Sequence, residues 1–270
     1  MHEKVALSVA APGVGPKSAV SPDGRERESI STLAAWSAGA PDEIAFWRDY
    51  LRTGGLQWPS EFQMRVDPTA ILTESQITSR LPSCTSETVR IIDVGAGPLT
   101  TLGKSIPGRR VELHATDALG HHYVRLMKSM GIRPMVPTER CHGEDLDLAF
   151  PSNYFDFAYA RNALDHCHDT PRVIANMVWI VKGGGWVILR HRENEAVSAS
   201  YRGLHQWNFE ERDGDTYVWN QQCRISLTDA FERVAQISTE RDGEWLVIAL
   251  HKHRFFRRLR ESIRLPGSRL

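Results

Sequence analysis

A carboxylate and an imidazole stand side by side near the middle of the chain, at Asp165 and His166. Imidazole titrates near neutral pH, so a histidine that a carboxylate orients can take a proton from a reacting group. We therefore consider His166 the leading candidate base and Asp165 its orienting partner, with His205 as the second candidate base. The alternative is structural, because Asp165 could cap the adjoining helix and His166 could bond only to a loop.

A second group of residues suited to binding a ligand lies at the end of the apolar run from Val89 to Val94. The run contains Asp93, and a glycine turn follows it. The run is dense in β-formers, which is typical of a strand covered on both faces in a parallel sheet. Gly95 and Gly97 lack a Cβ atom, so backbone N–H groups there can approach a ligand closely. We expect a short helix from Leu99 to Ile106 whose N-terminus would favour negative charge.

A third carboxylate lies at the end of the next predicted strand. Val111 to Ala115 is apolar enough for a second strand, and Asp117 follows it, twenty positions beyond Gly97. A carboxylate at this place can accept hydrogen bonds from both ribose hydroxyls of a nucleoside. Asp117 could also serve as the N-cap of the following helix, and the two roles are compatible.

The remaining elements alternate between helices and strands, which predicts an α/β architecture. Thr170 and Pro171 are typical of an N-cap and a first helical residue, and we expect that helix to end at residues 182–185. The other predicted helices cover residues 70–80, 121–130 and 227–235, after a partly amphipathic stretch over 30–52. The other predicted strands cover residues 135–138, 153–160, 186–189, 216–219 and 243–250, the last at the sheet edge.

Two motifs at the correct separation resemble a known family. Asp93, Gly95 and Gly97 match the pattern (D/E)-x-G-x-G, and residues 162–166 match N-x-L-(E/D)-H at the exit of the fourth predicted strand. The Lys-Gly-Gly-Gly turn at 182–185 matches a third pattern, L-K-P-G-G, except that Gly183 replaces the proline. The chain resembles the class I S-adenosylmethionine-dependent methyltransferases of the small-molecule type. This resemblance implies a Rossmann-like, seven-stranded, mostly parallel sheet sandwiched by helices, with an N-terminal helical cap.

The resemblance also implies the cofactor and its site. S-adenosylmethionine would be bound by residues of the glycine turn, the second strand end, the adenine loop and the exit of the fourth strand, namely Asp93, Gly95, Ala96, Gly97, Asp117, Gly143, Glu144 and Asn162. A nicotinamide-dependent oxidoreductase is the rival interpretation, but Thr100 stands where the dinucleotide fingerprint needs its third glycine. A cofactor-binding protein without activity is a further alternative.

The acceptor is less defined than the cofactor. We expect a hydroxyl of a small molecule, such as a sugar or a glycan end, because Trp58, Tyr201 and Trp207 could pack against ring faces. An N-methyltransferase of the same fold is the alternative. A magnesium ion held by Asp165 and Glu193 is compatible with the sequence, because magnesium uses few protein ligands. Zinc is disfavoured because no C-x-x-C pair is present.

Composition restricts the partners and the compartment. Lys and Arg total 33 and Asp and Glu total 33, so the formal charge of zero does not favour a nucleic acid. The four cysteines are far apart, which favours free thiols in the cytoplasm, and no apolar segment is long enough to predict a membrane span. A homodimer is compatible with the sequence. We divide the chain into a flexible arm (1–28), a helical cap (29–87), a cofactor-binding methyltransferase domain (88–251) and a basic tail (252–270).

Overall fold

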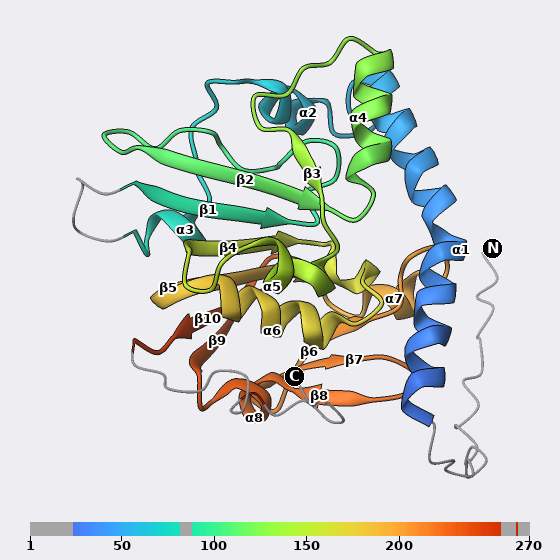
Figure 1. Cartoon of the computed structure of the whole chain (residues 1–270), viewed down its shortest axis with the longest axis vertical. Coiled ribbons are helices and arrows are strands. Elements are labelled where there is room, and N and C mark those ends of the chain that lie inside the picture. The colour runs from blue at the N-terminus through green and yellow to red at the C-terminus, as the bar shows by residue number, and fades with distance from the viewer. Residues whose placement is uncertain (1–23, 82–87, 255–262, 264–270) are drawn as a thin grey trace, which may run out of the picture.

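The computed structural model describes residues 24–81, 88–254 and 263, and its centre is a seven-stranded sheet (Figure 1). The strand order is β3-β2-β1-β4-β5-β10-β9. The first five of these strands are parallel, whereas β10 is antiparallel to both of its neighbours. The seven-stranded, mostly parallel sheet predicted from the sequence is thus confirmed. The bounds are β1 Val89–Val94, β2 Val111–Asp117, β3 Thr138–Arg140, β4 Phe155–Arg161, β5 Val181–Arg192, β9 Ala235–Asp242 and β10 Trp245–Lys252.

Both faces of the sheet are buried, as the apolar runs predict. Ile92 and Val94 point to one face, where they pack in a core that includes residues of α6 (Thr170–Ile180). Ile91 points to the other face, where the short helix α3 (Ser75–Thr78) and the segment after β1 complete a second core. In the register of the sheet, Asp93 of β1 lies opposite Ala115 of β2 and Tyr159 of β4, so the carboxyl ends of these three strands lie side by side.

The helix predicted over Leu99 to Ile106 is wrong, because this segment consists of bends and irregular chain that end in two isolated β-bridges. Its backbone groups bond to residues 70–72 instead of to one another: Lys104 N donates to Ala70 O at 2.7 Å, and Leu72 N donates to Ser105 O at 2.8 Å. A Cβ atom on Gly103 would lie 2.2 Å from the backbone of Ile71. The segment therefore packs against its neighbour as an extended chain.

The region after β5 also differs from the prediction. The strand expected at 216–219 is β7 (Asp215–Trp219), which lies in a separate three-stranded antiparallel sheet with β6 (Asn208–Arg212) and β8 (Arg224–Ser226). α8 (Leu227–Phe231) is shorter than expected. β10 lies between β5 and β9, so β9 is the true edge strand. Most of β9 is exposed and polar, and an edge strand of this kind lacks the apolar pattern that identified the others.

Smaller differences occur at the ends of elements. β3 begins at Thr138, where the strand predicted at 135–138 ends. The helix α4 (Gly120–Ser129) matches its prediction, although Val124, expected in the core, is 48% exposed. The N-cap of α6 is Asp169, whose side chain accepts a hydrogen bond from Arg172 N at 3.1 Å, and not Thr170. Residues 182–185 belong to β5 in the structure.

The N-terminal cap consists of α1 (Gly24–Thr53) and α2 (Pro59–Val66), and α1 runs across the carboxyl ends of β1 and β2 (Figure 1). α1 spans the partly amphipathic stretch predicted over 30–52 and continues without a break through Gly39 and Pro41. Trp47 and Phe62 pack together with α4, whereas Trp58 is 43% exposed. Residues 1–23 of the expected arm and most of the expected basic tail lie outside the described residues. Within the part of the chain that is described, no helix combines the length and the apolar character that crossing a membrane requires.

Candidate functional site

A cavity that is open to solvent lies at the carboxyl ends of β1, β2 and β4. Helix α1 covers it with three side chains, Trp36, Glu43 and Trp47. All eight residues expected at the cofactor line this cavity, and so does His166. Asp165 and His205 do not line it, but both contact His166. The structure therefore brings together the two motifs, which lie far apart in the sequence.

The glycine turn has the backbone conformation that its sequence requires. Gly95 has φ +73° and Gly97 has φ +64°, in the left-handed region that favours glycine. A Cβ atom on Gly97 would lie 2.6 Å from the Trp47 ring, and one on Gly95 would lie 2.4 Å from the Cβ atom of Ala163. Both positions therefore exclude any side chain, and the backbone forms the floor of the cavity directly.

Asp117 binds the glycine turn to the end of β2. Its Oδ2 atom accepts a hydrogen bond from Gly97 N at 3.1 Å, and its Oδ1 atom accepts one from Leu119 N at 2.8 Å. Burial raises the pKa of this carboxyl to about 6. Each carboxylate oxygen has a second lone pair, so Asp117 can still accept hydrogen bonds from a ligand in the cavity.

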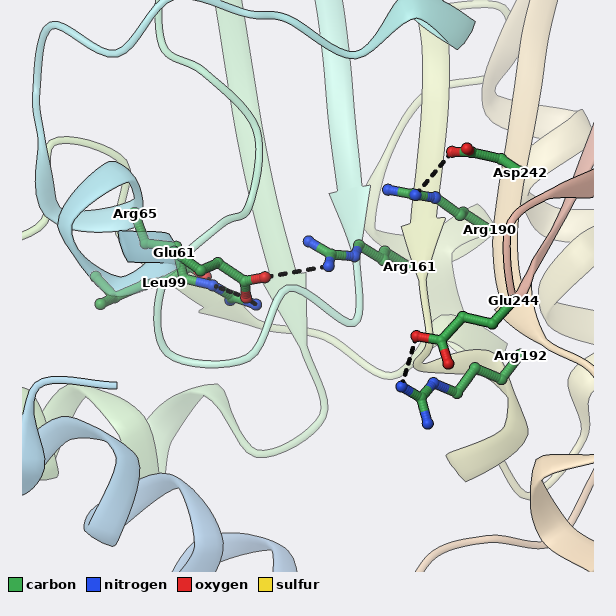
Figure 2. Close-up of polar contacts among 8 residues, drawn as sticks. All are labelled: Glu61, Arg65, Leu99, Arg161, Arg190, Arg192, Asp242 and Glu244. Atoms are coloured by element: carbon green, nitrogen blue, oxygen red, sulfur yellow. Dashed lines mark hydrogen bonds and ion pairs between the residues drawn. The ribbon is translucent and has the colours of Figure 1, made fainter. Parts of the chain in front are cut away.

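Asp93 stabilises the segment that follows the glycine turn. It is 2% exposed, and its Oδ2 atom accepts a hydrogen bond from the Thr100 hydroxyl at 2.6 Å. Burial raises the pKa of Asp93 to about 6. Arg65 of α2 donates to Leu99 O at 2.6 Å, which satisfies a carbonyl that the missing helix would have used (Figure 2). Asp93 and Arg65 together fix the segment after the turn without a helix.

Glu144 lines the cavity but fastens two loops to each other. It is 3% exposed, and its Oε1 atom accepts hydrogen bonds from His168 N at 2.9 Å and Asp169 N at 3.0 Å. Burial opposes its ionisation, but the contacts with His168 and with the N–H of Asp169 lower the pKa of Glu144 below its usual value. Asn176 of α6 donates to the carbonyl oxygens of Gly143 and Glu144, so α6 holds this loop in place.

Asn162 follows the end of β4 and has φ +48°. Its N–H donates to Arg190 O at 2.9 Å, and its Oδ1 atom accepts a hydrogen bond from Arg192 N at 3.3 Å. Asparagine tolerates this left-handed conformation better than most residues do. Asn162 therefore turns the chain out of β4 and into the cavity wall, where Ala163 faces Gly95.

The imidazole of His166 lies in a cluster of titratable side chains. Its Nε2 atom lies 3.1 Å from His205 Nδ1 and 3.4 Å from Asp165 Oδ2, and His205 Nδ1 is 2.7 Å from the same carboxylate oxygen. Asp165 therefore contacts both imidazoles and makes its shorter contact with His205, and its orienting role toward His166 stays a prediction. Burial opposes protonation of His166, but Asp165, Glu43, Asp117 and Glu195 raise its pKa above the usual value.

Glu43 is a site residue that the sequence patterns did not identify. Its Oε2 atom lies 3.8 Å from His166 Nδ1, and its Oε1 atom accepts a hydrogen bond from Trp47 Nε1 at 2.7 Å. In the sequence, Glu43 is one acidic residue within the partly amphipathic stretch over 30–52. Only the packing of α1 over the strand ends brings it to His166, and no local spacing reports that packing.

None of the three side chains expected to pack against the acceptor, Trp58, Tyr201 and Trp207, lines this cavity. Trp207 is 5% exposed and packs in the main core, Trp58 lies outside the residues that line the cavity, and the Tyr201 hydroxyl accepts a hydrogen bond from Asn208 at 3.1 Å. Trp36 and Trp47 of α1 supply aromatic walls in their place. His191 is fully buried and stacks on Phe209 at 4.1 Å, and burial lowers its pKa to about 4, so it belongs to the core.

The magnesium pair suggested by the sequence does not form. Both carboxylate oxygens of Glu193 accept hydrogen bonds from Arg241, at 2.8 and 3.1 Å, so Glu193 is engaged away from Asp165. Among the described residues, two other groups have ligand atoms within 4.8 Å of one another. One is Asp165, His166 and His205, and the other is His142, Glu144 and His168. Each offers two imidazoles and one carboxylate, a set that suits transition metals better than magnesium.

Comparison with known proteins places the domain in a class. The family model described as a methyltransferase domain matches residues 121–189. The match covers part of the seven-stranded sheet, whose strand order is that of the Rossmann-like methyltransferase fold. No curated protein matches the chain.

Solved structures show only distant likeness. The 1,6-didemethyltoxoflavin-N1-methyltransferase of Burkholderia thailandensis is 16% identical over 90% of this chain and 94% of that chain, with a TM-score of 0.43. An S-adenosylmethionine-dependent methyltransferase of Mesorhizobium loti is 13% identical over 66% and 96%, with a TM-score of 0.41. The match to the 4+2 cyclase SpnF is 19% identical, has a TM-score of 0.29, and spans only 39% of that protein.

Proposed function

We propose that the chain transfers the methyl group of S-adenosylmethionine to a hydroxyl group of a small molecule, a sugar or a glycan end, and that His166 takes the hydroxyl proton. The observation that carries this proposal is that His166 lines the same cavity as the glycine turn and Asp117. When it is bound, the cofactor supplies a methyl group already activated by the sulfonium, so the protein mainly has to position the acceptor and accept a proton.

The contacts of His166 define which nitrogen acts. Its Nε2 atom faces Asp165 Oδ2 and His205 Nδ1, so we assign the proton of the neutral ring to Nε2. Nδ1 then carries the free lone pair and accepts the proton of the acceptor hydroxyl. With S-adenosylmethionine bound there, the methyl group would pass to the acceptor oxygen as its bond to sulfur breaks, and the electron pair of that bond would stay on sulfur. The Glu43 carboxylate, which lies 3.8 Å from Nδ1, stabilises the imidazolium that results through the attraction of opposite charges.

The remaining residues bind and orient. We propose that Asp117 accepts hydrogen bonds from the ribose hydroxyls and that Gly95, Ala96 and Gly97 present their backbone to the methionine part. Asp93 orders that turn through Thr100. Gly143, Glu144 and Asn162 would complete the wall around the nucleoside. Trp36 and Trp47 of α1 restrict water over the reacting atoms.

Two measurements test this function. A calorimetric titration with adenosylhomocysteine should show binding at a single site, and a nicotinamide cofactor should neither bind nor raise the melting temperature. Methyl transfer to a panel of hydroxyl and amine acceptors, with and without magnesium, then identifies the acceptor. Transfer to amines alone would replace the O-methylation proposal by N-methylation, and rates that are equal in His166→Ala and the unmodified chain would exclude His166 as the base.

A further inference from the structure

Three arginines gather on one face of the sheet, at the carboxyl ends of β4 and β5. Arg161 is the last residue of β4, and Arg190, which lies opposite it in the sheet register, and Arg192 are near the end of β5. Their Cζ atoms lie 5.2, 4.9 and 5.5 Å from the ring centre of Trp245, the first residue of β10. Figure 2 shows Arg161 paired with Glu61 of α2, Arg190 with Asp242, and Arg192 with Glu244.

This arginine cluster, defined as Arg161, Arg190 and Arg192 around Trp245, continues from the cavity. Arg161 lines the cavity together with His166, whereas Arg190 and Arg192 lie beyond it. Arg65 also lines the cavity, and it shares one carboxylate with Arg161: Glu61 Oε1 lies 2.7 Å from Arg65, and Glu61 Oε2 lies 3.1 Å from Arg161. A ligand with one end at His166 can therefore extend toward positive charge.

The carboxylates that balance the outer arginines are replaceable. Asp242 lies 2.8 Å from Arg190 and Glu244 lies 2.8 Å from Arg192, but these acids are 54% and 60% exposed at the β9–β10 hairpin. Exposed ion pairs of this kind contribute little stability and are screened by water and salt. The more buried acids that face the cluster are Glu61 and Glu74, and burial raises the pKa of Glu74.

From this arrangement we propose that the arginine cluster binds an oxyanion group, a carboxylate, phosphate or sulfate, on the acceptor, in exchange with Asp242 and Glu244. A guanidinium group can bind such an anion through two parallel hydrogen bonds. The exposed, flexible carboxylates of Asp242 and Glu244 can therefore be displaced by it. This inference rests on the proposed function only where it states that the anionic group is part of the methyl acceptor. It narrows the acceptor class from hydroxylated small molecules to acidic ones, such as a uronic acid or a phosphorylated or sulfated sugar.

The first experiment is independent of methyl transfer. The full chain is titrated with sodium sulfate against sodium chloride at matched ionic strength, and NMR follows the Nε–H signals of the arginines. We expect saturating shifts for Arg190 and Arg192 with sulfate only. Arg224 is the matched control, because it also pairs with a carboxylate, Glu210, and lies 4.6 Å from the centre of an aromatic ring. Equal shifts at Arg224, or shifts that never saturate, would overturn the inference.

Variants test the exchange in both directions. Arg190→Gln should weaken sulfate binding by roughly tenfold or more, because a hydrogen bond to a charged group is lost. Asp242→Asn and Glu244→Gln should each tighten it by roughly two- to fivefold, because a weak competing anion is removed. A gain of affinity cannot come from a damaged fold. Glu210→Gln is the control and should leave sulfate affinity unchanged. No gain in either hairpin variant would contradict the proposed exchange.

A second titration assigns the anion to the acceptor. Glucuronic acid and glucose 6-phosphate should shift the signals of Arg190 and of His166 in the same titration, whereas glucose should shift neither. Anionic sugars that move only the arginine signals would separate the cluster from the acceptor and overturn that assignment. Methyl transfer is measured separately. Saturating sulfate shifts without any methyl transfer would remove the proposed function and leave the anion site standing.

Discussion

The two ends of the cavity are built in different ways. The end proposed to bind the cofactor comes from short segments whose side chains and turns act locally: Gly95 and Gly97 set the turn, and Asp117 binds it from the adjacent strand. The end proposed to accept the proton comes from distant segments, with Glu43 on α1 and His166 after β4, and His166 contacts His205, which lies outside the cavity beyond β5. The first end depends on backbone conformation, whereas the second depends on the packing of separate elements.

This difference predicts that the two ends respond to different changes. Substitutions at the cofactor end should alter adenosylhomocysteine affinity, because the binding surface that we propose there is the backbone itself. Substitutions at the proton-accepting end should alter the rate of methyl transfer and leave that affinity almost unchanged, because they change only the group that receives the proton. The variants below examine this separation.

The largest effect is expected for His166→Ala. Removing a general base lowers the rate of the chemical step by roughly 10²- to 10⁴-fold. Adenosylhomocysteine affinity, measured by calorimetry, should stay within about twofold, since the product carries no acceptor proton. Single-turnover methyl transfer measures the rate. If the rate and the affinity fall together, the two ends are not separable and His166 is part of the cofactor site.

The same contrast explains what the sequence could predict. Val89 to Val94, the glycine turn and Asp117 follow from short-range rules, because a buried strand, a left-handed turn and the next strand end are encoded in one short stretch of the chain. Glu43 could not be found, because its role depends on how α1 packs over the strand ends. The prediction of a helix at 99–106 rests only on the position of this segment after the turn. The segment bonds instead to Ala70 and Leu72, and its own residues carry no sign of these distant backbone partners.

The next largest effect is expected for Gly97→Ala. Gly97 has φ +64°, and a Cβ atom there would lie 2.6 Å from the Trp47 ring. An alanine in the left-handed region costs roughly 1–2 kcal/mol before any such clash is counted. Adenosylhomocysteine affinity should therefore fall by more than about tenfold, as measured by calorimetry.

A second glycine serves as the control for this substitution. Gly131 has φ +71° with open space around it, and it lies outside the cavity. Gly131→Ala should therefore lower stability alone, because it carries the same backbone strain without a contact to the site. Unchanged affinity in Gly97→Ala would mean that the turn does not contact the cofactor.

The pH dependence of binding examines the cofactor end more finely. The pKa of Asp117 is raised to about 6, so the carboxylate becomes protonated as the pH falls through 6 and loses its negative charge and part of its capacity to accept hydrogen bonds from ribose. Adenosylhomocysteine affinity should therefore fall below pH 6, by up to about tenfold per pH unit. Asp117→Asn should bind weakly and without this dependence. Because the pKa of Asp93 is also about 6, a slope that persists in Asp117→Asn would assign the titration to Asp93.

The smallest effect is expected for Glu43→Gln. Glutamine can still accept the hydrogen bond from Trp47, so α1 should keep its position and adenosylhomocysteine affinity should not change. The pKa of His166 should fall, because a negative charge 3.8 Å from Nδ1 is removed while Asp165, Asp117, Glu195 and His205 remain. Methyl transfer should slow by roughly fivefold, the effect of one unit charge at about 4 Å in water. Asp42→Asn removes the same charge from an exposed neighbour on α1 and should have no effect. Equal slowing in both variants would show that the net charge of the cap matters and that the contact with His166 does not.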